Sequence, residues 1–176
     1  MTGRDRVEDD EDLYRRVRET TPAGQICFEV ANGRVIFSQA AFNDPRNRPS
    51  VDRAKLRDFD PQRTRISKED GIVVLLTGRV RQLGHVQQRN QNGHHSQHAI
   101  DVVPEHEDGN PAHAVITTRP PLTSSSAFKR LKESLARLAT EAGWRVEPGS
   151  PLPRNDLATL LRRMLRWARH IFQRTG

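Results

Sequence analysis

Histidines gather in one stretch of the chain, and their spacing decides whether that stretch could bind a metal or carry acid–base chemistry. Residues 93 to 116 hold five of the seven histidines: His94, His95, His98, His106 and His113. A zinc site needs three or four converging ligands, most recognisably as HExxH, or as CxxC paired with HxxxH. Neither spacing is present, and HHSQH follows the polar segment QQRNQNG, which has no helical apolar stripe. We therefore expect no metal site, and a solvated loop at His94 and His95.

His113 differs from the other histidines because it follows a proline at the start of a predicted strand, in NPAHAVI. In a strand its side chain points away from those of Ala112 and Ala114. A half-buried imidazole needs a hydrogen-bond partner, and Asp101 on a neighbouring strand is one candidate. A structural hydrogen bond and a role as a functional acid, base or ligand-binding group both stay open.

Other signatures of catalysis are missing. No glycine-rich loop stands between a strand and a helix to hold a phosphate, and no GxSxG elbow is present. We expect Cys27, the single cysteine, to be a small core residue and not a nucleophile. A lone cysteine excludes an intramolecular disulfide and no secretory signal opens the chain, so we expect a cytoplasmic protein. The longest apolar run, residues 72–76, is far short of the ~18 residues of a transmembrane segment.

The charge of the chain indicates which partners it could bind. Its net charge is +7 and its pI about 10.6. Such a balance favours anionic partners, namely nucleic acid, anionic lipid or an acidic protein face. The charge is uneven, because residues 7–12 carry five acids, whereas residues 154–174 carry six arginines and one aspartate.

The arginine-rich C-terminal segment has the pattern of an amphipathic helix. At 100° per residue, the apolar side chains from Leu157 to Phe172 fall in one arc of about 160°, and arginines fill the rest. Residues 148–176 are therefore predicted to form a linker and a basic helix whose cationic face contacts nucleic acid or another polyanion. Docking on the body, docking on a second copy to form a homo-oligomer, and binding to an anionic membrane surface are the alternatives.

The N-terminal 147 residues suffice for a single domain, residues 12–147, preceded by a disordered acidic arm over residues 1–11. The clearest element within it is QICFEVANGRVIFSQ, in which two alternating runs flank Asn32-Gly33, a pair typical of a two-residue hairpin turn. We predict a β-hairpin over residues 25–38 in the sheet. Its register sets Val30 opposite Val35 and Phe28 opposite Phe37.

The remaining elements follow from periodicity and capping signals. Residues 12–20 suit a short helix or an extended entry to the sheet, and SKED at residues 67–70 resembles a capping box that predicts a helix to about residue 76. In PSVDRA, we expect Ser50 to cap a short helix and Arg53 to pair with a carboxylate. Strands are predicted over residues 79–88, 98–103 and 112–118, and a helix over residues 126–142.

Five motifs together resemble a pattern found in small bacterial proteins of uncharacterised function. They are LYRRV, FSQAAF, PSVDRA, IDVVP and NPAHA, and the resemblance covers residues 13–135. It implies a bacterial cytoplasmic protein and no particular activity. The C-terminal helix lies outside it.

A second resemblance points to an enzyme. The LYRRV start, a Gly-Arg strand and the serine of FSQAAF are similar to the opening of RES-type toxins and related ADP-ribosyltransferase folds, which bind and cleave NAD. It implies that Arg15 or Arg16 and Ser38 line an NAD pocket. No acidic residue stands in the context that this family uses to complete the site.

We therefore expect an α+β fold: a mostly antiparallel sheet, one covering helix and an appended C-terminal basic amphipathic helix. The favoured function is a non-catalytic accessory or interaction module of a bacterial cytoplasmic system, without a cofactor, that contacts nucleic acid or an acidic protein. The binding residues expected for it are Arg53, Arg162, Arg163, Arg166 and Arg169. The alternative is an NAD-consuming enzyme, which requires its groups to converge on one concave pocket. Its catalytic candidates are Arg15, Arg16, Ser38 and His113.

Overall fold

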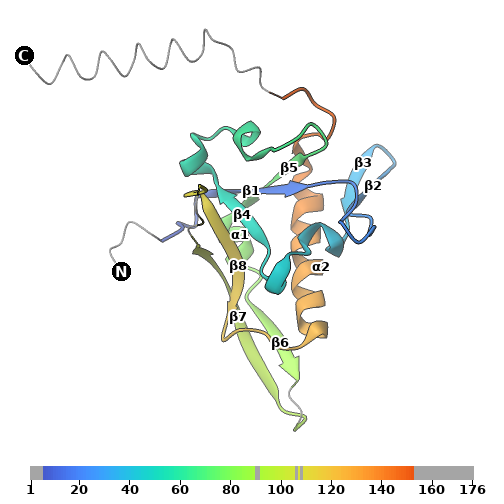
Figure 1. Ribbon diagram of the computed structural model, residues 1–176. Coiled ribbons are helices and arrows are strands. Elements are labelled where there is room, and N and C mark those ends of the chain that lie inside the picture. The colour runs from blue at the N-terminus through green and yellow to red at the C-terminus, as the bar shows by residue number, and fades with distance from the viewer. Residues whose placement is uncertain (1–5, 90–91, 106, 108, 153–176) are drawn as a thin grey trace, which may run out of the picture.

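The computed structural model describes residues 6–89, 92–105, 107 and 109–152 (Figure 1). The predicted C-terminal helix, with Arg162, Arg163, Arg166 and Arg169, lies outside these residues, as does His106. Placement of the helix and of its cationic face therefore stays a prediction.

A seven-stranded sheet organises the described chain. Its order is β6-β7-β8-β4-β1-β5-β9, and every neighbouring pair is antiparallel. The prediction of an α+β protein with a mostly antiparallel sheet is confirmed. The strands are β1 (Asp12–Val17), β4 (Ser50–Arg53), β5 (Gly71–Leu76), β6 (His85–Arg89), β7 (His95–Pro104), β8 (His113–Arg119) and β9 (Trp144–Val146).

Helix α2 (Ser125–Ala142) occupies the range in which the sequence predicts a helix. Its buried stripe includes Leu131, Leu135 and Leu138, and the helix contacts β3 (Arg34–Phe37), β5 and β6. The other helical segments are short: α1 (Thr77–Arg81) and the 3₁₀ turns η1 (Gln39–Phe42), η2 (Pro45–Asn47), η3 (Ala54–Arg57) and η4 (Pro61–Thr64).

The two faces of the sheet differ in composition. One face presents the apolar residues of the core, including Leu13, Val51, Val73 and Ile116, which share one buried cluster with the stripe of α2. Successive residues of a strand point to opposite faces. The other face therefore presents the alternate residues, many of them polar, and it carries the site described below.

The hairpin forms with the predicted register but in a different place. Strands β2 (Phe28–Ala31) and β3 (Arg34–Phe37) pair Val30 with Val35 and Phe28 with Phe37, as predicted. They make a separate two-stranded sheet and do not join the main one. The hairpin instead packs through aromatic rings, since the Phe28 and Phe37 rings lie 4.9 Å and 4.6 Å from that of Trp144.

The acidic segment near the N-terminus is ordered where the structure describes it. The prediction of a disordered arm over residues 1–11 is wrong for residues 6–11, because Val7 is completely buried and Glu11 is nearly so. The carboxylate of Glu11 accepts hydrogen bonds from Arg53 at 3.0 and 2.9 Å. Its carbonyl accepts from the backbone and hydroxyl of Thr77. Glu11 thus binds the body of the protein, and Asp9 does so through an ion pair with Arg81.

The helix predicted up to about residue 76 is a strand. Residues 71–76 form β5, with Ile72 and Val73 completely buried, because a β-branched run suits a sheet buried on both faces. Asp70, the last residue of SKED, accepts hydrogen bonds from the amides of Ile66 and Ser67 and closes a turn instead of capping a helix. The strand predicted over residues 79–88 is wrong at its start, which lies in α1.

Ser50 is not a helix cap, because it begins strand β4. Its amide donates to Asp44, and its carbonyl accepts from Arg15. The expected partner for Arg53 is confirmed, since its guanidinium pairs with Glu11 at 2.9 Å.

Candidate functional site

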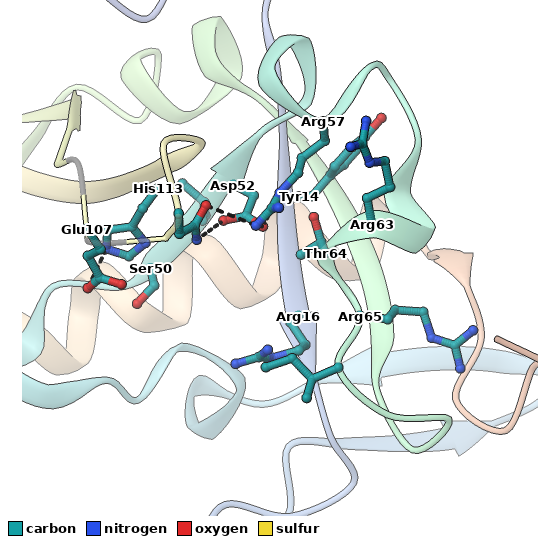
Figure 2. A pocket seen from close by; sticks show the side chains of 13 residues that line it. Tyr14, Arg16, Ser50, Asp52, Arg57, Arg63, Thr64, Arg65, Glu107 and His113 are labelled. Carbon is teal, nitrogen blue, oxygen red and sulfur yellow. Dashed lines mark hydrogen bonds and ion pairs between the residues drawn. The ribbon is translucent and has the colours of Figure 1, made fainter. Parts of the chain in front are cut away.

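A cavity of about 460 Å³ lies on the face of the sheet opposite α2 (Figure 2). Its walls come from β1, β4, the start of β8 and the segment over residues 57–66. This volume lies within the range of small-molecule sites, which is roughly 300 to 1,000 Å³. The cavity is therefore large enough for a ligand of nucleotide size.

Strand register brings the floor of the cavity together. Tyr14 lies opposite Asp52, and Asp52 lies opposite His113. Directly opposed residues share a face, and Arg16 follows Tyr14 at a spacing of two, so all four side chains point the same way. Burial and the nearby Asp12 carboxylate raise the pKa of Tyr14, so its phenol stays protonated and can donate a hydrogen bond.

Arg15 and Arg16 point to opposite faces. Arg15 is buried; its Nε and Nη2 donate to the Ala41 carbonyl at 2.9 and 2.7 Å, and its Nη1 pairs with Asp44 at 2.5 Å. Arg15 therefore attaches η1 to the sheet and does not reach the cavity. Arg16 is exposed on the cavity wall and makes no hydrogen bond or ion pair within the described residues of the chain.

A closed network forms a second wall of the cavity. Arg57 Nε donates to Asp52 Oδ2 at 2.8 Å, and its Nη2 donates to Asn110 Oδ1 at 3.0 Å. Asn110 Nδ2 in turn donates to Asp52 Oδ1 at 3.0 Å. Because each member binds the other two, the network fixes η3 to the start of β8 and neutralises the Asp52 charge.

His113 has different partners from the one predicted. Its Nε2 lies 3.3 Å from Glu107 Oε1 and 3.9 Å from Glu105 Oε2. Asp101, the predicted partner, pairs with Arg81 at 2.9 Å and with Arg119 at 3.4 Å. Asp101 lies on the neighbouring strand β7 but pairs with Thr117, four residues along β8 from His113, whereas the loop after β7 brings Glu107 to the imidazole.

The segment that closes the cavity is held by Arg65. Its guanidinium donates to the carbonyls of Ser150, Lys68 and Pro151 at 2.7, 2.9 and 3.1 Å. Its Nε and the hydroxyl of the neighbouring Thr64 are buried and have no partner among the described residues. The cavity wall therefore contains polar groups whose hydrogen-bonding capacity is unused.

The lining carries more positive than negative charge. Its arginines are Arg16, Arg57, Arg63 and Arg65, and its carboxylates are Asp52 and Glu107. Field lines are focused in a concave site with low-dielectric walls, so this imbalance attracts anions more strongly than a flat surface of equal charge. The arrangement can bind an anionic group next to a histidine that can donate or accept a proton.

Only some of the functional residues predicted from the sequence line the cavity. Arg16 and His113 line the cavity, whereas Arg15 and Ser38 do not. The Ser38 hydroxyl donates to the Ile26 carbonyl at 2.6 Å and accepts from the Ala40 amide, so it caps η1. Arg53, predicted to bind a ligand, is buried against Glu11 on the opposite face. The four residues proposed for NAD do not converge.

Several lining residues were missed by sequence reasoning, including Tyr14, Arg57, Thr64 and Asn110. A signal for Tyr14 and Asn110 was present, because LYRRV, PSVDRA and NPAHA are three of the motifs that carry the bacterial resemblance, whereas Arg57 and Thr64 lie outside those motifs. These motifs meet at the cavity, which they line with Tyr14, Asp52 and Asn110.

Among the described residues, no three His, Cys, Asp or Glu side chains lie close enough together to hold a metal ion, and this includes the histidine-rich stretch. His98 is buried, with its ring nitrogens 2.7 Å from the Pro120 carbonyl and 2.8 Å from the Ser96 hydroxyl.

Within the described residues, no helix is long and apolar enough to cross a membrane.

Comparisons with protein-family models, with curated proteins and with solved structures found no match to this chain.

Proposed function

We propose that this protein is a non-catalytic nucleic-acid-binding module of a bacterial cytoplasmic system, and that the cavity contacts a phosphate of the nucleic acid. The observation that carries the proposal is the Arg16 guanidinium, which is unpaired within the described residues and lies beside an arginine-rich wall. Arginine presents five donors in a fork that matches phosphate oxygens, and an Arg without a carboxylate partner keeps its full charge for a ligand.

The other wall residues support this role in different ways. Arg57 is fixed by Asp52 and Asn110, so its position is set before a ligand arrives. Arg63 pairs with Asp58 at the surface, which leaves it able to exchange partners. The net charge of +7 favours the same kind of partner.

The C-terminal arginines belong to the same proposal as a second contact. Changing Arg162, Arg166 and Arg169 to Glu should weaken binding in a salt-dependent way. An acidic protein is the alternative partner, and its carboxylates would bind the same arginines. The NAD-consuming alternative has no observation in its favour, because only Arg16 and His113 of its four residues share the cavity.

Fluorescence anisotropy with the full chain and a labelled 20-bp duplex tests the proposal. Each phosphate contact contributes a slope of about −0.9 to log K against log salt, so Arg16→Ala should weaken binding about 15-fold at 50 mM salt and about 4-fold at 200 mM. Arg137→Ala, on the exposed face of α2, removes an equal charge outside the site and is the matched control. Equal losses in the two variants would refute a role for the cavity.

A further inference from the structure

Strands β6 and β7 project from the body of the molecule as a two-stranded ribbon (Figure 1). β6 is the edge strand of the sheet, so the ribbon has no neighbour on that side within the described chain. In its register Gln87 lies opposite Gln97, and Arg89 lies opposite His95. The ribbon therefore takes its second strand from the histidine-rich stretch of the sequence.

The face of the ribbon that carries Gln88 packs against the body of the protein. Gln88 Oε1 accepts from the amides of Thr123 and Ser124, and Gln88 Nε2 donates to the Thr123 hydroxyl. Val86 and His98 are buried on the same side. These contacts attach the ribbon to the residues that precede α2, which gives the opposite face a fixed position.

The opposite face presents five exposed polar side chains. They are His85, Gln87, Arg89, His95 and Gln97. No side chain in this set makes a hydrogen bond or ion pair with the described residues. The sequence from 85 to 99 contains no Asp or Glu, so the ribbon itself carries no negative charge that would repel a phosphate backbone.

This set has the chemistry of base recognition. Gln can make a bidentate pair with the N6 and N7 of adenine, and Arg with the O6 and N7 of guanine. A merely protective edge strand carries Lys, Pro or inward charges, which discourage strand addition. A face of amides, imidazoles and one guanidinium offers directional donors and acceptors instead.

We propose that the β6–β7 ribbon enters the major groove of duplex DNA and reads base edges with Gln87, Arg89 and Gln97. The inference rests on the proposed function, in that the partner is nucleic acid. The major groove is about 12 Å wide and admits a two-stranded ribbon. At about 3.4 Å per residue, the five residues of β6 span about 14 Å, the rise of about four base pairs.

The ribbon and the cavity lie on one face of the sheet. On β7, Ala99 lies opposite His85 of β6 and opposite Arg119 of β8, so these three residues share a face. On the same face, Val115 of β8 lies opposite Ser50 of β4, and the alternation continues to Tyr14 and Arg16 of β1. Arg119 on this face has a side chain that is 69% exposed. We therefore expect a duplex bound by the ribbon to run over the face that carries Arg119, which pairs with Asp101, and Arg16.

Selection from a duplex library with a random 12-bp core tests the inference, with the full chain as bait. The wild-type protein should enrich a short motif, and Arg137→Ala should enrich the same one. The combined variant Gln87→Ala, Arg89→Ala, Gln97→Ala should lose the motif yet keep salt-dependent binding. On the selected duplex each single change should lower affinity about 5- to 150-fold, the range for one bidentate base contact.

A second variant separates base reading from stability and charge. Arg89→Lys keeps the charge and the exposed position but loses the planar fork, so it should relax the motif while the melting temperature and salt slope stay unchanged. Enrichment of an unaltered motif by the combined variant, or binding without any motif by the wild type, would overturn the inference. Absence of all binding to nucleic acid would instead refute the proposed function and the ribbon with it. Arg16→Ala should weaken every sequence alike, which distinguishes the two surfaces.

Discussion

Asp70 should be a principal determinant of stability, because its completely buried carboxylate accepts three hydrogen bonds. Oδ2 accepts from the amides of Ile66 and Ser67 at 2.7 and 2.8 Å, and Oδ1 accepts from Arg18 Nε at 2.7 Å. These bonds close the segment that places Thr64 and Arg65 at the cavity. Replacing Asp70 with Ala removes an acceptor from all three donors.

The loss of stability on replacing Asp70 with Ala can be worked out from these three hydrogen bonds. Each orphaned partly buried donor costs about 1 kcal/mol or more, and the Arg18 pair adds about 1 kcal/mol at most, since the Arg18 side chain is 54% exposed. We expect Asp70→Ala to lower the free energy of unfolding by about 2 to 4 kcal/mol at pH 7. Asp70→Asn should lower it less, because the amide oxygen can still accept from the two backbone donors.

The effect should depend on pH in one direction. Burial alone would raise the pKa of Asp70, but the bonds from Arg18 and from the two amides outweigh it and hold the pKa below its usual value. The ionised form is therefore favoured by folding, and its contribution is present above the unfolded pKa of about 3.9. It is lost as the pH falls through the lower folded pKa.

Urea unfolding followed by circular dichroism at pH 7 and at pH 2 to 3 checks this expectation. The gap between wild type and Asp70→Asn should narrow on acidification. Glu69→Gln is the matched control, because Glu69 is an exposed carboxylate on the neighbouring residue, and it should stay within about 0.5 kcal/mol of wild type. A gap that is absent at pH 7, or unchanged by pH, would refute the role assigned to the Asp70 hydrogen bonds.

Two further predictions concern the core. Gly71→Ala should lower the free energy of unfolding by about 1 to 3 kcal/mol, because the added Cβ would lie 2.5 Å from Trp144 Cζ3 and the ring must move. Thermal or urea unfolding measures this change, and a neutral result would show that the ring moves freely. Burial raises the pKa of the Cys27 thiol, so Cys27 should react with a thiol reagent at pH 7 far more slowly in the native protein than in urea, and equal rates would contradict its place in the core.

Elements with strong local signals could be predicted from the sequence. Asn32-Gly33 specifies the hairpin because both residues adopt positive φ, 52° and 72°. The apolar stripe of residues 126–142 specifies a helix because its apolar residues recur at helical spacing. In contrast, SKED offers a capping box and GIVVLL a β-branched run, and only the pairing of β5 with β1 decides between them.

The cavity was only partly predictable, because it is assembled by pairing between distant strands. Tyr14, Asp52 and His113 are far apart in the sequence, and each is an ordinary strand residue locally. Alternation could show that Arg15 and Arg16 face opposite ways, but which of them meets the core depends on the tertiary fold. The partner of His113 came from a loop, where no periodicity exists to predict it.

Amide chemical-shift mapping of the isotope-labelled full chain during titration with a 12-bp duplex shows whether the cavity and the ribbon both contact nucleic acid. We expect shifts in β1, β4 and the start of β8 around the cavity, and in β6 and β7 along the ribbon. Shifts confined to the outer face of α2 around Arg137, or to the β2–β3 hairpin, would contradict this expectation.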